Sequence, residues 1–464
     1  MSQAAVTARI RQLRAALGRR LVVLDDDPTG SQSVRGVPVV TAWGPQELGW
    51  AFAHPAGAVF ILTNTRSLEP AAAAARVNEV AAAVERAART AGLAVDLVSR
   101  GDSTLRGHYP LETDLLAERA AALGHPVDVL LIVPAYPEVG RITVDDVHLA
   151  RRGNDFVPVA ETDYARDASF GYTTSNLRDW VAEKTGGRVP AEAVGSVRLR
   201  DVREGGPERV AEILQAGHGG LPIVVNAEST ADLDTVALGV AQAELAGVRI
   251  LVRCAPTFVA ALLGLERPGP LHPSELPRAL DGNGLVVVGS HVELTTLQLC
   301  ELRRSRPDLA VVELDVERLL AGEDVAQQEI ASATAALTAA LAGGTTVVST
   351  SRRRVTGSDE AASLVVAAMV SKALVEVVRR TVAARPPAWV IAKGGITSSD
   401  IATDALQITR AEVVGQLFDG YVSVWANRGS GPLAGMPYVV FAGNVGDVET
   451  LAAAVELLDS RRGA

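Results

Sequence analysis

Acidic and basic side chains gather in two short stretches of the N-terminal half that could bind and activate a polar ligand. Residues 25–31 read Asp-Asp-Asp-Pro-Thr-Gly-Ser, and residues 102–106 read Asp-Ser-Thr-Leu-Arg. A carboxylate beside a reacting hydroxyl can orient it and accept its proton, and an arginine can clamp a carboxylate or phosphate with two parallel hydrogen bonds. The two stretches therefore predict a site for a small, polyhydroxylated, anionic molecule.

The charged candidates of this site are three acids and three arginines. They are Asp26, Asp27, Asp102, Arg66, Arg100 and Arg106, and the hydroxyls of Ser103 and Thr104 accompany them. The alternative interpretation is structural: a solvated acidic turn at residues 25–27, a helix cap at Asp102 and a solvated helix residue at Arg106. We favour the ligand site, because a simple turn rarely needs three acids at the end of a buried strand.

Three glycine turns in the C-terminal half form a second candidate site. Each turn follows an apolar run: residues 289–290 (Gly-Ser), 394–398 (Gly-Gly-Ile-Thr-Ser) and 443–446 (Gly-Asn-Val-Gly). Glycines let backbone N–H groups approach a phosphate closely. None of the turns has the Walker or the dinucleotide-binding spacing, but three in one half favour a nucleotide or another polyanion. Lys393 precedes the double glycine, and phosphate contact and a surface position are equally open for it.

Histidines and cysteines are weaker candidates. His108 and His148 are predicted to be surface or structural residues, whereas His291 follows the turn at residues 289–290 and could contact a ligand. Cys254 and Cys300 are predicted to be small core residues. Two cysteines alone make neither a zinc site nor a disulfide framework, and the sequence leaves the ligands of any metal ion unknown.

Alternating strands and helices position these residues. The predicted strands of the N-terminal half are 21–24, 37–41, 59–65, 93–98, 127–134, 194–199, 223–225 and 250–252. Helices are predicted at 71–91 and 111–123, and residues 135–172 are predicted to be irregular. Strand, polar loop and helix in repetition are typical of a parallel doubly wound sheet. Because ligands bind at the carboxyl ends of such strands, the loops at 25–31, 64–67 and 102–106 should converge.

A segment rich in proline divides the chain into two domains. Residues 268–283 are the predicted linker between an N-terminal domain at 1–267 and a C-terminal domain at 284–464. The second domain has predicted strands at 285–288, 311–314, 346–348, 389–392 and 438–442. The predicted fold class is α/β, with two domains that are each a largely parallel sheet with flanking helices. The active site is expected in the cleft between them.

Composition and charge narrow the class of protein. The chain has 464 residues, a formal net charge of −10 and 48% hydrophobic residues, so two domains are expected and a nucleic-acid partner is not. No apolar run approaches the ~20 residues of a membrane helix, and the N-terminus lacks the apolar core of a signal peptide. We expect a cytoplasmic protein without a membrane partner. The sequence leaves the oligomeric state open, with a homodimer as one candidate.

Six motifs, in this order along nearly the whole chain, resemble the four-carbon acid sugar kinase family. They are residues 26–30 (Asp-Asp-Pro-Thr-Gly), 102–107 (Asp-Ser-Thr-Leu-Arg-Gly), 134–141 (Pro-Ala-Tyr-Pro-Glu-Val-Gly-Arg), 289–290 with Thr295, 394–398 and 443–446. The resemblance implies an enzyme that uses ATP and Mg²⁺ to phosphorylate threonate, erythronate or 3-oxo-tetronate. It places the sugar acid on the N-terminal domain and the nucleotide on the C-terminal domain.

The resemblance also assigns site residues. It implies catalytic roles for Asp27, Asp26 and Asp102, and sugar-acid contacts at Asp26, Arg66, Asp102, Ser103, Thr104, Leu105 and Arg106. It implies ATP contacts at Ser290, Gly394, Gly395, Ile396, Thr397, Ser398, Gly443 and Asn444. Two residues depart from the family pattern: Pro28 replaces a phenylalanine, and Ile396 follows the double glycine where an acid is usual. Asp400 or Asp447 could supply that acid.

Two other functions remain open. One is a nicotinamide-dependent oxidoreductase of hydroxy acids, although the dinucleotide-binding fingerprint is missing. The other is a non-catalytic sensor of sugar acid and nucleotide, which the departure at Ile396 keeps in consideration. An absorbance assay for the reduced nicotinamide would identify the first, and ATP turnover dependent on a sugar acid would exclude the second.

Overall fold

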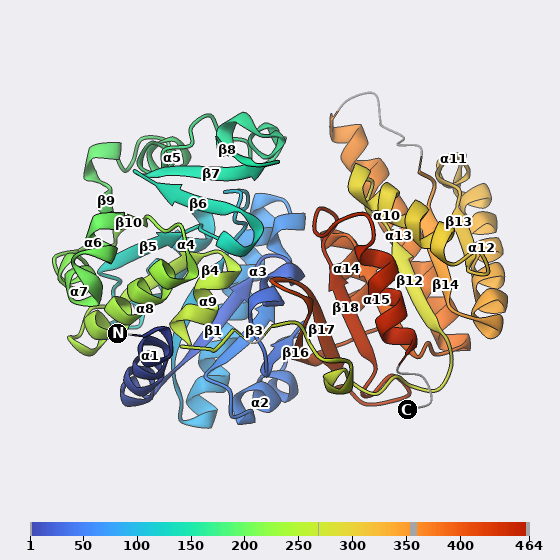
Figure 1. The fold of residues 1–464 in the computed structure, drawn as a ribbon, viewed down its shortest axis with the longest axis horizontal. Helices are drawn as coiled ribbons and strands as arrows, with labels where there is room; N and C mark the ends of the chain where they lie inside the picture. Colours follow the sequence, from blue (N-terminus) through green and yellow to red (C-terminus); the bar gives the residue numbers. More distant parts are fainter. Residues whose placement is uncertain (1, 268, 353–359, 461–464) are drawn as a thin grey trace. The chain divides into compact units, whose positions relative to one another are not determined.

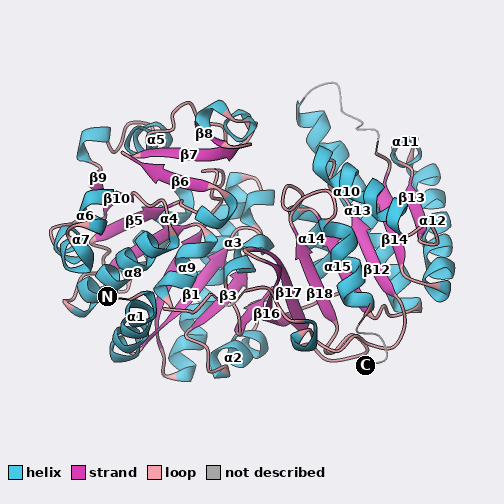
Figure 2. Cartoon of the chain, viewed as in Figure 1, coloured by secondary structure: helices cyan, strands magenta, loops and turns pink. Residues whose placement is uncertain are grey.

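The computed structural model describes residues 2–267, 269–352 and 360–460, which fold into two compact units. Unit 1 is Met1–Pro268 and unit 2 is Gly269–Ala464. Each unit is an α/β structure with helices against a mostly parallel sheet, as Figures 1 and 2 show. The predicted fold class of two α/β domains is thereby confirmed. No helix in the described part of the chain combines the length and apolarity needed to cross a membrane.

Unit 1 contains one parallel sheet. Its strands, in spatial order, are β2 (Val37–Val40), β3 (Ala58–Leu62), β1 (Arg19–Asp25), β4 (Ala94–Arg100), β11 (Ile250–Cys254), β5 (Val129–Val133), β10 (Leu221–Val225) and β9 (Gly195–Val197). Its helices are α1 (Gln3–Leu17), α2 (Pro45–Ala53), α3 (Pro70–Ala91), α4 (Leu111–Ala122), α5 (Leu177–Lys184), α6 (Leu199–Arg203), α7 (Gly206–Gln215), α8 (Thr230–Leu245) and α9 (Pro256–Leu262).

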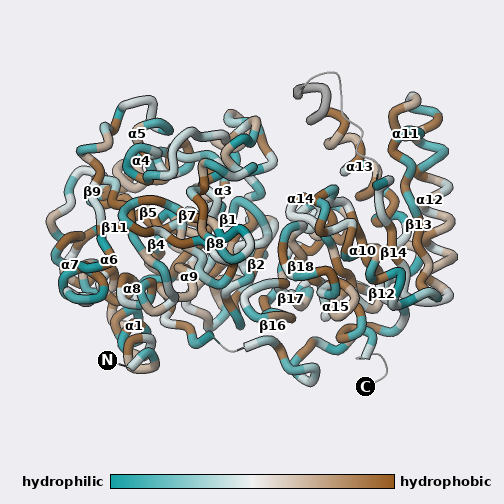
Figure 3. Tube along the Cα trace, turned by 45° about the horizontal axis from the view of Figure 1, so that its top comes forward, coloured by the Kyte–Doolittle hydropathy of each residue, from teal (hydrophilic) through white to brown (hydrophobic). Residues whose placement is uncertain are grey.

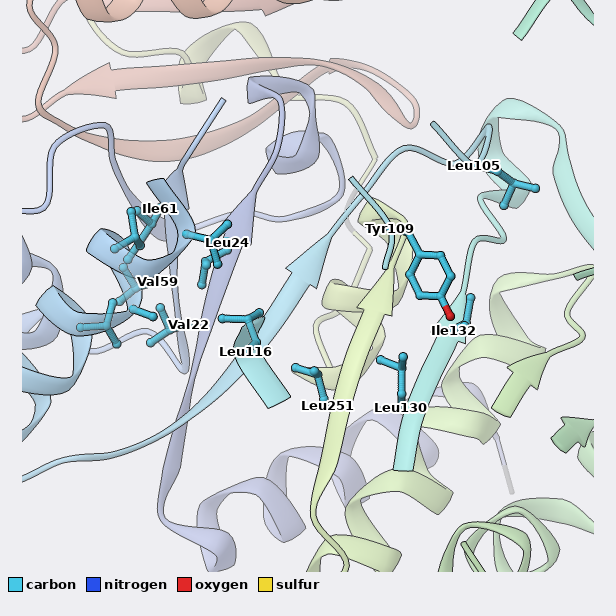
Figure 4. Packing of buried hydrophobic residues seen from close by; sticks show 14 of the residues in the cluster. Val22, Leu24, Val59, Ile61, Leu105, Tyr109, Leu116, Leu130, Ile132 and Leu251 are labelled. Carbon is cyan, nitrogen blue, oxygen red and sulfur yellow. The ribbon is translucent and has the colours of Figure 1, made fainter. Parts of the chain in front are cut away.

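The core of unit 1 lies between the sheet and its helices. Val22, Ile61 and Ile132 of the strands pack with Leu116 of α4 and with Tyr109, and all five are buried (Figure 4). A sheet covered on both faces needs almost continuous apolar strands, and β5 (Val-Leu-Leu-Ile-Val) is accordingly hydrophobic along its length in Figure 3. This packing fixes the carboxyl ends of the strands, where the charged residues follow.

The prediction that residues 135–172 are irregular is wrong for much of that segment. Three antiparallel strands, β6 (Arg141–Val144), β7 (Val147–Arg152) and β8 (Asp155–Pro158), form a small separate sheet. Short 3₁₀ turns flank it at Pro137–Val139, Val159–Glu161 and Asp163–Arg166. Asp145 and Asp146 both have positive φ (50° and 65°) and join β6 to β7, as expected of a two-residue hairpin turn. We call residues 134–175 the meander.

Unit 2 has a sheet with five parallel strands and an antiparallel hairpin. In spatial order the strands are β13 (Ala310–Leu314), β14 (Thr346–Thr350), β12 (Gly284–Val288), β15 (Trp389–Lys393), β18 (Pro437–Phe441), β17 (Tyr421–Asn427) and β16 (Arg410–Phe418). The helices are α10 (Glu293–Ser305), α11 (Val316–Leu319), α12 (Glu323–Gly343), α13 (Glu360–Ala384), α14 (Gly395–Asp400) and α15 (Thr450–Asp459).

The proline-rich segment after residue 268 is not an extended connection throughout. Leu271, Leu276 and Ala279 are buried and belong to the same hydrophobic cluster as Trp389 and Val439 of the unit 2 sheet. Burying a leucine side chain stabilises a fold by about 1.5–3 kcal/mol. Residues 269–283 therefore fold as part of unit 2.

Candidate functional site

The first candidate site lies at the carboxyl ends of three neighbouring strands of unit 1. Asp25 is the last residue of β1 and lies opposite Leu62 of β3 and Arg100 of β4. The residues that follow these three strands therefore begin side by side, and Thr63 donates both its N–H and its hydroxyl to the carbonyl of Asp25. The predicted convergence of the polar loops is confirmed.

Arginines separate the adjacent carboxylates at this edge. Arg66 binds Asp26 with two hydrogen bonds, Nε to Oδ2 at 3.1 Å and Nη2 to Oδ1 at 2.6 Å. Its Nη1 lies 3.6 Å from Asp27 Oδ2 and 3.9 Å from Asp102 Oδ2. Arg100 Nη2 lies 3.2 Å from Asp26 Oδ1. This alternation of charge allows four carboxylates to share a buried site.

Asp25 and Arg100 form the buried base of the site. The Nε of Arg100 donates to Asp25 Oδ1, and both side chains are almost fully buried. Burial raises the pKa of Asp25 to about 7, although the charge of Arg100 opposes that rise. A side chain on Gly30 would collide with the Asp25 carboxylate and with Arg100, so glycine at position 30 allows the chain to pass over this pair.

Asp27 and Asp102 both remain charged at neutral pH. Burial alone would raise the pKa of Asp27, but Arg66, Arg100 and the Thr29 N–H outweigh it and lower that pKa. In the same way Arg106 and Arg66 outweigh burial and hold the pKa of Asp102 well below its usual range. Both carboxylates are therefore acceptors for hydroxyl protons rather than donors.

The loop of residues 102–107 presents a second guanidinium. Arg106 Nε donates to Asp102 Oδ2 at 2.8 Å, and its Nη1 lies 3.6 Å from Asp167 Oδ2. The guanidinium carbon lies 5.1 Å from the centre of the Tyr164 ring. The hydroxyl of Thr104 donates to Asp102, and Ser103 and Leu105 are buried. The structure thus brings all the predicted sugar-acid residues of unit 1 together, and their contact with a ligand stays a prediction.

The second candidate site lies in unit 2, at the carboxyl ends of the adjacent strands β12, β15 and β18. Ser290 N–H donates to the Lys393 carbonyl at 3.3 Å, and Gly394 N–H donates to the Phe441 carbonyl at 2.8 Å. Thr295 of α10 donates to the carbonyl of Gly443 at 2.9 Å. The three glycine turns, far apart in the sequence, are therefore linked by hydrogen bonds.

Glycine is required where these turns approach one another. A Cβ atom on Gly443 would lie 2.5 Å from Ser290 Oγ, and one on Gly394 would lie 2.9 Å from Thr397 Oγ1. Gly394 also has φ +127°, a conformation that other residues rarely adopt. A side chain on Gly289 would collide with the hydroxyl of Thr397. A side chain at any of these glycines would therefore force the hydroxyl of Ser290 or Thr397, or the turn itself, to shift.

The remaining predicted nucleotide residues differ in exposure. Ile396 is 58% exposed and Asn444 is exposed, whereas Ser398 is fully buried. The hydroxyl of Ser398 donates to the Ala392 carbonyl at 2.7 Å, and its carbonyl accepts from Tyr438. Gly395 is the first residue of α14, and Ser398 lies on the same first turn of that helix. Ser398 therefore fastens this turn to β15 and β18, and contact of these residues with ATP stays a prediction.

Lys393 is buried, so the surface alternative for it is wrong. Its Nζ donates to the Ala442 carbonyl at 2.6 Å and lies 3.7 Å from the centre of the Phe441 ring. Burial lowers the pKa of Lys393 to about 6. At neutral pH the amine is mostly uncharged, and it joins the end of β15 to the residues before Gly443.

The weaker candidates are also placed. His108 is buried, with Nε2 at 3.0 Å from the Thr65 carbonyl. Cys254 is buried as predicted, but Cys300 is exposed on α10, so the prediction of a core position for it is wrong. His291 Nε2 lies 3.3 Å from the hydroxyl of Thr350. His148 is buried within the meander.

Two acids near the glycine turns, Asp400 and Asp447, are the predicted alternatives for contact with Mg²⁺. Asp400 accepts a hydrogen bond from Ser371 at 2.5 Å, and burial raises its pKa, which disfavours the charged form that a cation needs. Asp447 Oδ1 accepts from Thr450 and from the N–H of Glu449. Within residues 2–267, 269–352 and 360–460, no three His, Cys, Asp or Glu side chains cluster as metal ligands. A role for Asp400 or Asp447 as the acid that Ile396 replaces stays a prediction.

Comparisons with known proteins agree with this division of sites. A family model for a sugar-binding N-terminal domain matches residues 21–262, and one for a nucleotide-binding C-terminal domain matches residues 285–451. A search of curated protein sequences returns no significant match.

Solved structures share the fold over almost the whole chain. One is a proposed tRNA synthase from Salmonella typhimurium LT2, with 18% identity and a TM-score of 0.65, over 94% of this chain and 98% of that one. Another is a Haemophilus influenzae protein from a family of unknown function, with 18% identity and a TM-score of 0.60, over 94% and 100%. At such identities the likeness concerns the fold.

Proposed function

Because the chain belongs to the four-carbon acid sugar kinase family, we propose that it is an ATP-dependent kinase acting on a hydroxyl of a four-carbon sugar acid. Threonate, erythronate and 3-oxo-tetronate are the candidate acceptors. The observation that carries the proposal is the charged site of unit 1, where acids and guanidiniums alternate at the carboxyl ends of β1, β3 and β4. A sugar acid has the matching chemistry, with one carboxylate and several adjacent hydroxyls.

Asp27 and Asp102 are the proposed acceptors of the hydroxyl proton. Both are held ionised, so either can orient an attacking hydroxyl and take its proton as the phosphoryl group is transferred. Both carboxylate oxygens of Asp26 are bound by Arg66 and Arg100. We therefore assign Asp26 mainly to holding Arg66 in place beside the other two acids.

Arg106 is the proposed clamp for the substrate carboxylate. Only its Nε is hydrogen-bonded to Asp102, while the ring of Tyr164 lies 5.1 Å from the guanidinium carbon. A guanidinium can present a pair of parallel N–H groups to a carboxylate. A bound substrate carboxylate would take over part of the ion pairing that Arg106 now makes with Asp102 and Asp167.

The nucleotide is assigned to the glycine turns of unit 2. The turns at residues 289–290, 394–398 and 443–446 would line the phosphate site, with Thr397 and Asn444 beside them. The N–H groups of Ser290 and Gly394 already donate to the carbonyls of Lys393 and Phe441, so the phosphate donors are expected among the other groups of these turns. Mg²⁺, when bound with ATP, neutralises charge on the transferred phosphoryl group. Because the described acids form no cage, we expect its protein ligands to be few.

The test is an ADP-release screen of the purified protein over four-carbon aldonates and their 2- and 3-oxo relatives. We expect ADP release that depends on one or a few of these acids and follows saturation kinetics. Release of ADP without an acceptor, or none with any acid, contradicts the proposal. A parallel assay at the absorbance of the reduced nicotinamide identifies an oxidoreductase, and calorimetric binding without turnover identifies a sensor.

A further inference from the structure

We infer that the meander shapes the sugar-acid site, with His148 and Tyr172 as positioning residues for the loop of residues 102–107. The inference rests on the proposed function, because it concerns which residues hold that loop in its binding geometry. Both residues lie more than one structural element away from the loop in sequence, and neither belongs to a motif of the resemblance.

His148 on β7 holds the first of two successive loop carbonyls. Its Nε2 lies 2.7 Å from the Ser103 carbonyl, and its Nδ1 lies 2.9 Å from the hydroxyl of Thr143 on β6. A carbonyl only accepts, so Nε2 carries the proton and Nδ1 accepts from Thr143. His148 is fully buried, and burial lowers its pKa to about 4, which preserves this single-proton form at neutral pH.

Tyr172 holds the second carbonyl. Its hydroxyl donates to the Thr104 carbonyl at 2.7 Å, and the side chain is buried. Its own N–H donates to the Ala165 carbonyl at 3.1 Å within the meander. Two consecutive carbonyls of the loop are thus bound by side chains from one separate subdomain. Buried carbonyls without partners are unfavourable, so the meander supplies what the main sheet does not.

The loop needs such support because its backbone is strained. Leu105 has φ +67°, and Gly107 has φ +115°. A left-handed conformation costs a residue with a side chain about 1–2 kcal/mol, and it persists only where the surroundings enforce it. The Leu105 side chain is anchored in the core of unit 1 (Figure 4). The carbonyl contacts on its N-terminal side and this anchor together fix the turn that aims Arg106.

The meander also contacts Arg106 itself. Asp167 lies 3.6 Å from its Nη1, and the Tyr164 ring lies 5.1 Å from its guanidinium carbon. Arg141 of β6 donates to the Tyr164 hydroxyl at 3.1 Å and holds that ring. The same subdomain therefore positions both the backbone of the loop and its charged side chain.

The test compares Tyr172→Phe, His148→Leu and His148→Gln with Thr162→Val. Glutamine retains an N–H donor for the Ser103 carbonyl, and leucine does not. Thr162 donates to the Val159 carbonyl at 2.6 Å inside the meander. Thr162→Val is therefore the matched control, because it also removes one hydrogen-bonding hydroxyl from the meander but none that reaches the loop of residues 102–107. We expect Tyr172→Phe and His148→Leu each to raise the KM for the sugar acid about fivefold or more, the change for one neutral hydrogen bond. The KM for ATP should stay within about twofold, and His148→Gln should recover part of the loss.

Limited trypsin digestion gives a readout that needs no substrate. Cleavage after Arg106 requires local opening of the loop, so it should become several-fold faster in Tyr172→Phe and His148→Leu but not in Thr162→Val. Unchanged cleavage after Arg106, or acceleration equal to that at arginines elsewhere in the chain, overturns the inference. If no sugar acid is turned over by the wild type, the proposed function fails, while this digestion still decides whether the meander holds the loop.

Discussion

At the scale of single residues, Arg106 offers the sharpest test of carboxylate binding. Lysine at this position keeps the charge but loses the planar fork. Arg106→Lys should therefore weaken sugar-acid binding by ~1.5–3 kcal/mol, the range for a hydrogen bond to a charged group, and leave ATP binding in the other unit nearly unchanged. Calorimetry measures both. A substrate analogue whose carboxylate is reduced to an alcohol should bind the wild type weakly, and its affinity should fall little further in the variant. An equal loss for acid and alcohol would transfer the role to Arg66.

Asp27 should act in chemistry more than in folding. Asp27 caps the 3₁₀ turn at Pro28–Ser33 by accepting from Thr29 N–H at 2.8 Å, and asparagine caps helices as well as aspartate does. Asp27→Asn therefore keeps the turn but removes a proton acceptor. We expect turnover to fall by roughly 10²-fold or more, with a small decrease in melting temperature because asparagine loses the attraction to Arg66 and Arg100. Near-normal turnover would assign the proton transfer to Asp102.

Lys393 should impose a distinctive pH dependence on stability. Its pKa is about 6 in the folded state, whereas the ordinary value of a solvated lysine is 10.5, so between these values the unfolded state binds one more proton. The contribution of Lys393 to the free energy of unfolding therefore rises with pH, with a slope approaching about 1.4 kcal/mol per pH unit. Lys393→Met removes that slope. Urea unfolding at pH 6.5, 8 and 9.5 should show the variant gaining most on the wild type at the lowest pH, and parallel curves would contradict the assignment.

The types of the site residues could be predicted from the sequence, but their pairing could not. The strand Leu21–Leu24 and the acids after it indicate a ligand edge, and hydroxyls and arginines follow the next strands. However, Arg66 lies 40 residues from Asp26, and Arg100 lies 75 residues from Asp25. The pairing of guanidiniums with acids depends on the spatial order of the strands. β1 lies between β3 and β4, so this order differs from the order along the chain.

At the scale of elements, the glycine turns should depend on the absence of side chains. Gly443→Ala places a methyl group 2.5 Å from Ser290 Oγ, which pushes apart the turns after β12 and β18. ATP affinity should fall at least tenfold, about 1.4 kcal/mol. The matched control is Gly343→Ala in α12, where a Cβ has no atom within 4 Å. Calorimetry that finds equal ATP binding in both variants would remove Gly443 from the nucleotide site.

The elements predicted best are those with strong apolar patterns. Helix α3 begins and ends at Pro70 and Ala91, and the sequence predicts almost the same bounds from its proline and its alanine-rich run. The meander was missed because its short strands carry charged residues, such as Arg151 and Arg152, and bury only alternate positions. The pair Asp145-Asp146 between two valines is the signal that could have indicated its first hairpin.

At the scale of the whole molecule, the two units should respond to different ligands. Hydrogen–deuterium exchange of the full chain measures this, because a ligand that binds only the native state suppresses local opening. A sugar acid should protect residues 25–31, 64–67 and 102–107 in unit 1. ATP should protect residues 289–290, 394–398 and 443–446 in unit 2. At ligand concentrations of 100 Kd the stabilisation is about 2.7 kcal/mol, which slows exchange through complete opening roughly 100-fold.

The pattern of protection, rather than its size, decides the assignment of ligands to units. Each unit has its own buried core, with Val22 and Ile61 in the first and Val286 and Ile391 in the second. The matched comparison is the Gly443→Ala variant, in which ATP protection should weaken while sugar-acid protection is retained. Protection of residues 102–107 by ATP alone, with residues 394–398 unaffected, would reverse the assignment and contradict the proposed kinase. We expect the sugar acid to protect the three segments of unit 1, ATP to protect the three segments of unit 2, and the protein to release ADP when both ligands are present.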